Sequence, residues 1–492
     1  MIENRVKLPV FDDYWIDFRR GTTRRWFAPE AYSLAPLGHY GSMFFDPGAG
    51  KYRLYLEDVL KVDGDPRHAR RYLKLAESDD LREFSLYASP HGDDVLYDGE
   101  TGLHGCTVLY DDHDADPARR YKLCGMLDMG RYTEMGDGAN WMGVEIAFSG
   151  DGIHWERHPE LRASPQTSDA LNKLMYNPLL GEYALFHRSA YVDRRISMRT
   201  SRDLEHWSAP RLILHPGASY NDEHTAYQHY SLSARYMDGI FYGLLWRYNT
   251  SLCNDDYSRM YGYMEPELVY SYDGREFLYT TGKPLMERPY PPLPGCAGLS
   301  PLDICESRDG RDCFILCSGQ LFVHGARDTD RTLAEMNRRQ TVTPGNPVYR
   351  IRKDGFCGIE SVSPGGMVIT KGVALLRDDL SFNLRCGCGW ARFGIMDIQG
   401  HYIEGFEPDN CVPFAYDDSV DVRPVWKDHS LNELLGRQVR IAVELNTAIL
   451  HCVSMTAQPY IRQKQRSFAD PEGVVDARMD SGYCPFPGQM NR

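Results

Sequence analysis

The carboxyl side chains that could carry chemistry in this chain lie at the ends of predicted strands. Asp169 precedes one extended run, Asp222 and Glu223 precede the next, and Glu57 ends an earlier one. Asp13 lies in an N-terminal segment that we expect to pair with the last sheet of the fold. Two facing carboxyl groups, one protonated and one ionised, can act as a general acid and as a nucleophile or base. These five residues are the predicted catalytic candidates, provided that the fold brings them together.

Aromatic, imidazole and guanidinium groups occur near the same strand ends and could bind a polar ligand. Indole and imidazole rings can stack on a sugar ring and bond its hydroxyl groups. A guanidinium group beside a carboxylate lowers the pKa of the carboxyl group and keeps it ionised. The residues predicted to bind substrate are His104, Trp141, His187, Arg188, Trp246 and Arg247. Packing between strands for Trp246 and structural hydrogen bonds for the histidines stay open as alternatives.

A short phrase that recurs along the chain predicts the elements that would position these groups. It reads Ser, any residue, Asp, Gly or Leu, two residues and an aromatic residue, and its copies begin at Ser78, Ser149, Ser201 and Ser271. The Asp side chain can bond its own backbone, and Gly accepts a positive φ, so the phrase predicts a tight turn without chemistry. Intervals of 71, 52 and 70 residues leave room for one antiparallel sheet per copy. Such spacing is typical of a β-propeller.

Hairpin patterns around these phrases predict the number of sheets. An extended run, a turn and a second extended run occur five times, near residues 40–57, 106–123, 174–188, 230–247 and 302–317. After residue 346 the strands lack the phrase and are spaced as in a β-sandwich, with a short helical turn near 430–436. The predicted fold is all-β. It has a five-bladed β-propeller catalytic domain over residues 1–345, a β-sandwich over 346–462 and a C-terminal tail over 463–492.

Length and charge narrow the functional classes. A chain of 492 residues exceeds what one core usually holds, so two domains are expected. The formal net charge of −14 argues against a nucleic-acid surface, which needs a face rich in Lys and Arg. No apolar run approaches the roughly 18 residues of a membrane span, and the N-terminus does not resemble a signal peptide. We therefore expect a cytoplasmic protein with no nucleic-acid or membrane partner.

The cysteine pattern indicates neither disulfides nor a zinc site. The 13 cysteines are an odd number scattered along the chain, and many lie in apolar strand runs where a thiol acts as a small hydrophobe. Without an export signal, disulfide bonds are not expected. Cys386 and Cys388 are separated by one residue and lack a second pair at zinc-finger spacing. The prediction is a protein without metal or cofactor.

Several motifs together resemble a known superfamily over residues 8 to 455. They are Phe11-Asp12-Asp13-Tyr14-Trp15-Ile16, the stretches 116–122 and 201–210, His324-Gly325, Arg352-Lys353-Asp354-Gly355-Phe356 and Ile403-Glu404-Gly405-Phe406. With them the chain resembles the five-bladed β-propeller glycoside hydrolases of the invertase, inulinase and levanase (β-fructosidase) type and of the arabinofuranosidase type, as a divergent branch. The resemblance implies a C-terminal β-sandwich and places Asp169 where this superfamily tends to have its acid. The Trp-Met-Asn-Asp-Pro, Arg-Asp-Pro and Glu-Cys motifs of the fructosidases are absent, so their catalytic residues cannot be transferred.

The leading hypothesis is a glycoside hydrolase that cleaves a small fructofuranoside or arabinofuranoside, or a short oligosaccharide, with two axial carboxyl groups. One alternative is a transglycosylase, or a phosphorylase in which phosphate held by Arg or His replaces water. Another is a non-catalytic carbohydrate-binding propeller. A six-bladed sialidase-like fold would need three converging Arg residues, which the sequence does not show. The β-sandwich is expected to support the propeller or to form a contact in a homo-oligomer.

Overall fold

The chain folds into β-structure throughout the part that the computed structural model describes. That part comprises residues 5–61, 69–99, 102–128, 143–165, 168–188, 194–214, 227–250, 262–324 and 344–459. These residues form strands and three short 3-10 helices, η2 (Pro117–Arg119), η5 (Pro408–Asn410) and η6 (Leu431–Leu434). Across these ranges we find no helix with the length and apolar character needed to cross a membrane.

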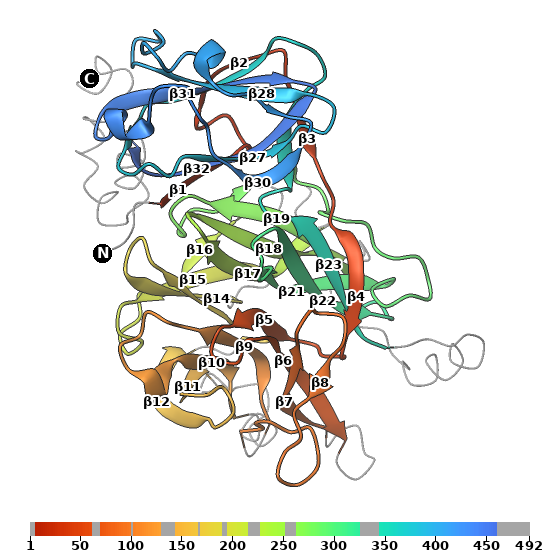
Figure 1. Ribbon diagram of the computed structural model, residues 1–492. Helices are drawn as coiled ribbons and strands as arrows, with labels where there is room; N and C mark the ends of the chain where they lie inside the picture. The colour runs from red at the N-terminus through yellow and green to blue at the C-terminus, as the bar shows by residue number, and fades with distance from the viewer. Residues whose placement is uncertain are drawn as a thin grey trace, which may run out of the picture.

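Five sheets of four antiparallel strands form a propeller, which confirms the predicted number of blades (Figure 1). From the inner strand outwards, blade one is β5 (Gly41–Asp46), β6 (Lys51–Lys61), β7 (Ala69–Ser78) and β8 (Ser85–Leu86). Blade two is β9 (His104–Tyr110), β10 (Tyr121–Met126), β11 (Val144–Ser149) and β12 (Glu156–Ser164). Blade three is β13 (Lys173–Asn177), β14 (Glu182–Arg188), β15 (Ile196–Ser201) and β16 (Arg211–Ile213).

Blade four is β17 (Tyr227–Met237), β18 (Ile240–Thr250), β19 (Gly262–Ser271) and β20 (Leu278–Tyr279). Blade five is β21 (Gly298–Glu306), β22 (Asp312–Gln320), β23 (Asn346–Arg352) and β4 (Glu30–Ala35). The innermost strands β5, β9, β13, β17 and β21 contact one another around the ring. The strand entrances of all five blades therefore converge on one axis.

The recurring phrase builds the turn after the third strand of blades one to four. In each copy the Ser Oγ accepts a hydrogen bond from the backbone N–H three residues later, at 2.8 to 2.9 Å. That later residue has a positive φ whether it is Gly or Leu: 62° at Leu81, 78° at Gly152, 67° at Leu204 and 76° at Gly274. The phrase is a turn motif with no place at the axis, as predicted.

The N-terminal segment is divided between the two parts of the fold. Strand β4 pairs with β23 and closes the propeller ring, a role that we had expected for the segment containing Asp13. Strands β1 (Arg5–Pro9), β2 (Ile16–Arg20) and β3 (Thr23–Trp26) pair instead with C-terminal strands. The propeller strands thus run from Glu30 to Arg352, whereas the predicted boundaries were 1 and 345. Strand pairing between distant segments leaves no local sequence signal, which explains the difference.

The C-terminal strands form the β-sandwich. They are β24 (Cys357–Ser361), β25 (Gly366–Thr370), β26 (Val373–Leu375), β27 (Ser381–Arg385), β28 (Trp390–Met396), β29 (Phe414–Ala415), β30 (Asp418–Val422), β31 (Gln438–Asn446) and β32 (Ala448–Pro459). Figure 1 shows β28 and β31 in one layer and β1, β27 and β32 in the other. The predicted helical turn is η6, which begins at a capping box formed by Ser430 and Glu433.

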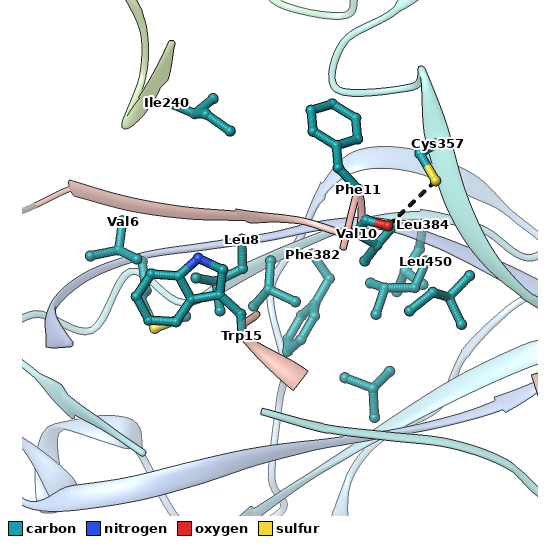
Figure 2. Packing of buried hydrophobic residues seen from close by; sticks show 14 of the residues in the cluster. Val6, Leu8, Val10, Phe11, Trp15, Ile240, Cys357, Phe382, Leu384 and Leu450 are labelled. Carbon is teal, nitrogen blue, oxygen red and sulfur yellow. Dashed lines mark hydrogen bonds between the residues drawn. The ribbon is translucent and has the colours of Figure 1, made fainter. Parts of the chain in front are cut away.

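The core of the sandwich is completed by N-terminal side chains. Figure 2 shows Val6, Leu8 and Trp15 beside Phe382 and Leu450, all buried. Burial of such apolar area stabilises a fold by roughly 25 cal/mol per Å². The buried side chains between Val6 and Trp15 therefore contribute directly to the stability of the C-terminal unit.

A buried ion pair joins the sandwich to the propeller. Lys7 of β1 is fully buried, and its Nζ lies 3.1 Å from Asp354 Oδ1 and 3.7 Å from Asp238 Oδ2. The Tyr242 hydroxyl of blade four also donates to Asp354 Oδ1, at 2.6 Å. Burial opposes the charge of Lys7, but the combined attraction of several nearby groups, Asp354 first among them, outweighs it and raises the pKa of the lysine. Both charges are thus retained at the contact between the two units.

Candidate active site

Three side chains from three blades form a continuous network at one end of the axis. His104 is the first residue of β9, Glu57 lies in β6, and Asp169 precedes β13. His104 Nδ1 lies 3.0 Å from Glu57 Oε1, and His104 Nε2 lies 2.9 Å from Asp169 Oδ1. The imidazole ring therefore bridges two carboxyl groups that are far apart in the sequence. All three were among the predicted site residues.

Glu57 is the buried end of this network. Its side chain has no exposed surface, and Oε1 also accepts a hydrogen bond from Arg71 Nη1 at 2.9 Å. The Cys106 N–H lies 3.3 Å from Oε2. Burial would raise the pKa of Glu57, but the charges and hydrogen bonds of His104 and Arg71 prevail and lower it. Glu57 is therefore an ionised anchor without access to solvent.

Asp169 is the open end of the network. Its side chain is 65% exposed, and Arg188 Nη1 lies 3.3 Å from Oδ2. Although partial desolvation opposes ionisation, the hydrogen bond from His104 and the charge of Arg188 lower the pKa of Asp169 to about 2. A carboxyl group with this pKa is ionised at neutral pH, which suits a nucleophile or a base. It does not suit the acid that the superfamily resemblance had implied at this position.

His104 carries a positive charge in this arrangement. Carboxylates are acceptors only, so both ring nitrogens must donate for the two hydrogen bonds to form together. Burial would lower the pKa of His104, but Glu57 and the hydrogen bond to Asp169 raise it above its ordinary value. Both N–H donors of the imidazolium group are thus used in hydrogen bonds to the two carboxylates. It fixes the position of Asp169 and holds its own protons in those bonds.

A stack of aromatic rings lies beside the network. The Trp246 ring is stacked between Tyr40, with centroids 5.7 Å apart, and Tyr230, with centroids 5.8 Å apart. Tyr40 also meets the His104 ring edge to face at 5.0 Å. Trp246 is only 2% exposed, and its Nε1 donates to Pro301 O. The structure therefore places Trp246 in packing between blades, the alternative that the sequence had left open.

Cationic and imidazole groups line the blade-four side of the same region. The Arg188 guanidinium lies 4.3 Å from the centroid of the Tyr230 ring, and that of Arg194 lies 4.8 Å from the centroid of Tyr248. The hydroxyl groups of Tyr230 and Tyr248 each lie 3.3 Å from a ring nitrogen of His324. Cations over aromatic faces are held in place without losing their charge. The exposed Asp169 carboxylate therefore faces a positively charged and aromatic wall.

A second buried charge cluster closes the axis below this region. Asp303 of β21 accepts hydrogen bonds from the Met43 N–H at 3.0 Å and from Arg235 Nη2 at 2.7 Å. Lys173 Nζ lies 2.8 Å from the same carboxyl oxygen. Burial lowers the pKa of Lys173 to about 8 despite the opposing charge of Asp303. These residues come from four blades, so the cluster ties the ring together and forms a floor.

The remaining predicted residues fall into two groups. Asp13 pairs with Arg19 and Arg24 beside the sandwich strands and is not brought to the axis. Arg247 points to Asn249 and to the Gly282 carbonyl, away from the network. His187 is buried in β14 and forms no hydrogen bond to the network; burial lowers its pKa to about 4. Asp222, Glu223 and Trp141 lie outside the described residues.

Sequence reasoning missed several residues that the structure brings to this site. Arg71 lies in the third strand of blade one, where it reads as an ordinary exposed strand residue. Tyr40 and Tyr230 read as strand aromatics in an all-β chain. Their proximity to a strand entrance was the available signal, since the inner strands of a propeller converge there. The pairing of Arg71 with Glu57 follows from the register of β6 and β7. This register sets Glu57 opposite Leu73, two residues from Arg71, and it cannot be read from the sequence.

The described residues offer little that could hold a metal ion. The one grouping of three suitable side chains within these ranges is Asp111, Asp112 and His113. Asp111 already receives the Lys122 ammonium group at 2.8 Å and the Tyr183 hydroxyl at 2.7 Å. The other two side chains are exposed. We assign no metal to this grouping.

Comparisons with known proteins find similar solved structures at low sequence identity. No protein-family model and no curated protein matches the chain. Similar solved structures include an N-acetylgalactosamine deacetylase from F. plautii (TM-score 0.40, 11% identity, covering 72% of this chain and 97% of that chain). A β-fructofuranosidase from Bombyx mori is also similar (TM-score 0.38, 10% identity, covering 89% of this chain and 94% of that chain). So is an arabinanase from Bacillus subtilis (TM-score 0.36, 12% identity, covering 65% of this chain and 95% of that chain). At such identities and TM-scores these similarities assign neither an activity nor a substrate.

Proposed function

We propose that this protein is a glycoside hydrolase whose reaction takes place at the end of the propeller axis, beside Asp169. The observation that supports this is the network of Glu57, His104 and Asp169, in which one carboxylate is buried and the other is 65% exposed. Burial of charged groups costs desolvation free energy, which their mutual attraction and hydrogen bonds must offset. Here it holds an exposed, ionised carboxylate in a fixed position, which is what a nucleophile or a base requires.

The acid of the reaction must be a different group. Both Glu57 and Asp169 have lowered pKa values, so neither holds a proton to give to a leaving oxygen at neutral pH. Asp222 and Glu223 are the remaining candidates from the sequence. They precede β17, the inner strand of blade four, whose Tyr230 lies under Arg188. We propose that one of them is the general acid and that Asp169 is its ionised partner.

The substrate is proposed to be a small fructofuranoside or arabinofuranoside, or a short oligosaccharide of these sugars. The aromatic and guanidinium groups around Asp169 suit a ligand with an apolar ring face and many hydroxyl groups. A cytoplasmic location and contacts between subunits through the β-sandwich stay predictions. No cofactor is part of the proposed reaction.

A substitution at Asp169 tests the proposal. Aryl arabinofuranosides and short fructose oligosaccharides would be incubated with the wild-type protein, with Asp169→Asn and with Asp79→Asn. Asp79 is an exposed carboxylate in the turn after β7 and serves as the matched control. We expect cleavage by the wild type and the control, and a loss of about 10²-fold or more in Asp169→Asn. Full turnover by Asp169→Asn would exclude the site, and absence of cleavage of any sugar would favour a binding propeller.

A specific observation favours phosphorolysis as a second candidate. Nε and Nη2 of Arg188 are buried and have no hydrogen-bond partner among the described residues, while Nη1 holds Asp169. Buried guanidinium N–H groups require acceptors, and phosphate oxygens provide them in the matching geometry. In such a reaction a phosphate oxygen bonds the anomeric carbon as the glycosidic C–O bond breaks, and the leaving oxygen takes a proton. Formation of a sugar 1-phosphate only when phosphate is added would select this candidate over hydrolysis.

A further inference from the structure

A cavity of about 500 Å³ lies between blade five and the sandwich, away from the propeller axis. Its walls come from the segment that joins β3 to β4, from β22 and β23 of blade five, and from β27, β30 and β32 of the sandwich. Figure 1 shows β23 and β4 on the propeller side and β30 on the sandwich side of this junction. A pocket of this size can enclose a small ligand.

Guanidinium groups dominate the charged lining of the cavity. Arg311, Arg350, Arg352 and Arg385 outnumber the carboxylates of Glu30, Asp312 and Asp418. Arg352 is fully engaged, because its Nε donates to Asn383 Oδ1 at 2.6 Å and its other nitrogens meet Leu384 O and Asp418. Arg385 shares the same Asp418, at 3.4 Å. The carboxylate of Asp418 is therefore already divided between two cations.

The other two arginines form no short ion pair with the described residues, although the charge of Asp312 acts on both and that of Asp309 acts on Arg311. Arg350 reaches Glu30 only at 4.0 Å, and the Glu30 side chain is 80% exposed. The guanidinium of Arg311 has no ion pair or hydrogen bond with any residue in the described ranges, although its backbone N–H is bonded in the turn before β22. Exposed pairs such as Arg350 with Glu30 contribute little stability. The cavity therefore presents two guanidinium groups whose N–H donors are not taken up by a short ion pair with the described residues and can receive an anion.

A buried histidine offers the cavity a hydrogen-bond acceptor, whereas the arginines offer only donors. His451 lines the cavity and is 1% exposed, and its Nδ1 lies 2.8 Å from the Cys357 carbonyl oxygen. A carbonyl oxygen only accepts, so Nδ1 carries the proton. Burial lowers the pKa of His451 to about 4, so the ring is neutral and Nε2 is an acceptor. Nε2 has no hydrogen-bond partner among the described residues.

An apolar ring completes the set. Phe27 lines the cavity next to His451, with ring centroids 5.4 Å apart. Guanidinium groups bind anions, a lone imidazole acceptor can accept from a hydroxyl group, and an aromatic face suits the C–H face of a sugar. We infer that this cavity is a second, non-catalytic binding site for a sugar unit that carries an anionic group, either a carboxylate or a phosphate. The site is separate from the axial network and does not depend on the proposed activity.

Titration calorimetry of the full-length protein tests the inference. The ligands are glucuronate, glucose 6-phosphate, neutral glucose and inorganic phosphate. The variants are Arg311→Gln, His451→Phe, the control Arg202→Gln from an exposed turn of blade three, and Asp169→Asn at the axis. We expect one of the two anionic sugars to bind with one site per chain. Arg311→Gln should weaken this binding by about tenfold, since a charge-assisted hydrogen bond is lost. Arg202→Gln and Asp169→Asn should leave it unchanged.

The arms of the experiment separate the sources of the signal. Stronger binding of glucuronate or of glucose 6-phosphate identifies the anion, and either result supports the site. If glucose binds as tightly as the anionic sugars, the arginines have no role in recognition. If inorganic phosphate binds as tightly as glucose 6-phosphate, the site does not recognise the sugar. Loss of binding in Asp169→Asn but not in Arg311→Gln would place the ligand at the axis and overturn the inference. The thermal unfolding midpoint of His451→Phe is measured together with its affinity. An unchanged midpoint shows that a loss of affinity in this variant does not come from unfolding.

Discussion

Replacement of His104 by Phe removes the bridge between Glu57 and Asp169 while keeping a ring of similar size beside Tyr40. The two ring nitrogens make the hydrogen bonds at 3.0 and 2.9 Å that hold the two carboxylates. In His104→Phe, Glu57 stays buried and retains Arg71 Nη1 and the Cys106 N–H. The variant therefore separates the contribution of the bridge from that of the remaining partners.

The magnitude follows from the burial of the two carboxylates. A hydrogen bond between charged groups contributes about 1.5 to 3 kcal/mol, and removing one partner of a buried pair adds the cost of the charge left behind. Asp169 is 65% exposed, so solvent screening reduces its share to well under about 1 kcal/mol. We expect His104→Phe to lower the free energy of unfolding by about 2 to 4 kcal/mol, most of it through Glu57.

The effect depends on pH with a definite sign. The pKa of His104 is raised in the fold, so its contribution is complete below the ordinary value of 6.5 and is lost as the pH rises through the folded value. The pKa of Glu57 is lowered, so its contribution is present above the ordinary value of 4.5 and is lost as the pH falls through the folded value. The difference between wild type and His104→Phe should therefore be largest between pH 4.5 and 6.5.

Urea unfolding followed by tyrosine and tryptophan fluorescence, repeated from pH 4 to pH 9, measures this difference. His206→Phe is the matched control, because His206 is 85% exposed and its ring pairs with Asp203 at a turn, far from the network. In a protein that already carries Glu57→Gln, the further substitution His104→Phe should have little additional effect on the free energy of unfolding, as expected for coupled groups. A loss below about 1 kcal/mol at pH 5.5, or a loss that grows as the pH rises above 6.5, would refute the bridging role of His104.

Two further predictions concern the scaffold. Lys7→Met should lower the free energy of unfolding by about 3 to 5 kcal/mol, since Asp354 stays buried without its cation. In the same urea assay, the double variant Lys7→Met with Asp354→Asn should recover part of this loss. Additive effects of the two substitutions would contradict the pairing. Ser201→Ala should cost about 1 kcal/mol, because the Leu204 N–H loses its acceptor while φ stays at 67°. Ser78→Ala should cause a similar loss in blade one, and no loss in either variant would exclude the turn motif as a stabilising element.

The sequence predicted the repeating parts of the fold because repetition is local. Each Ser-x-Asp turn forms its hydrogen bonds within six residues, so its residue types are visible in the sequence itself. The five hairpins and the helical turn at 431–434 follow for the same reason. Strand β4 carries no such signal, because its place beside β23 depends on a partner more than 300 residues away. The prediction for ring closure consequently failed where the pairing was distant.

The candidate site was predictable only in part, for a related physical reason. Glu57, His104, Asp169 and Arg188 could be proposed because strand entrances of a propeller converge on the axis. Their protonation states could not, since these depend on which cation lies beside which carboxylate. After His104, Arg71 also favours the ionised state of Glu57, yet its sequence context is that of an ordinary strand. The lowered pKa of Asp169 therefore depends on partners that only the fold brings together.

The path of the first 35 residues explains why the second site exists at all. The chain begins in the sandwich with β1, β2 and β3 and then enters blade five with β4. The connection between β3 and β4 carries Phe27, and β4 begins at Glu30, so both cavity-lining residues lie where the chain crosses from one unit to the other. The return crossing after β23 brings Arg350 and Arg352 to the same place. Two crossings in opposite directions therefore connect the units at this junction, where the cavity has walls from both. The buried pair of Lys7 and Asp354 adds a third connection between the same two units. The geometry of this cavity is therefore a direct consequence of how the N-terminus is shared between the propeller and the sandwich.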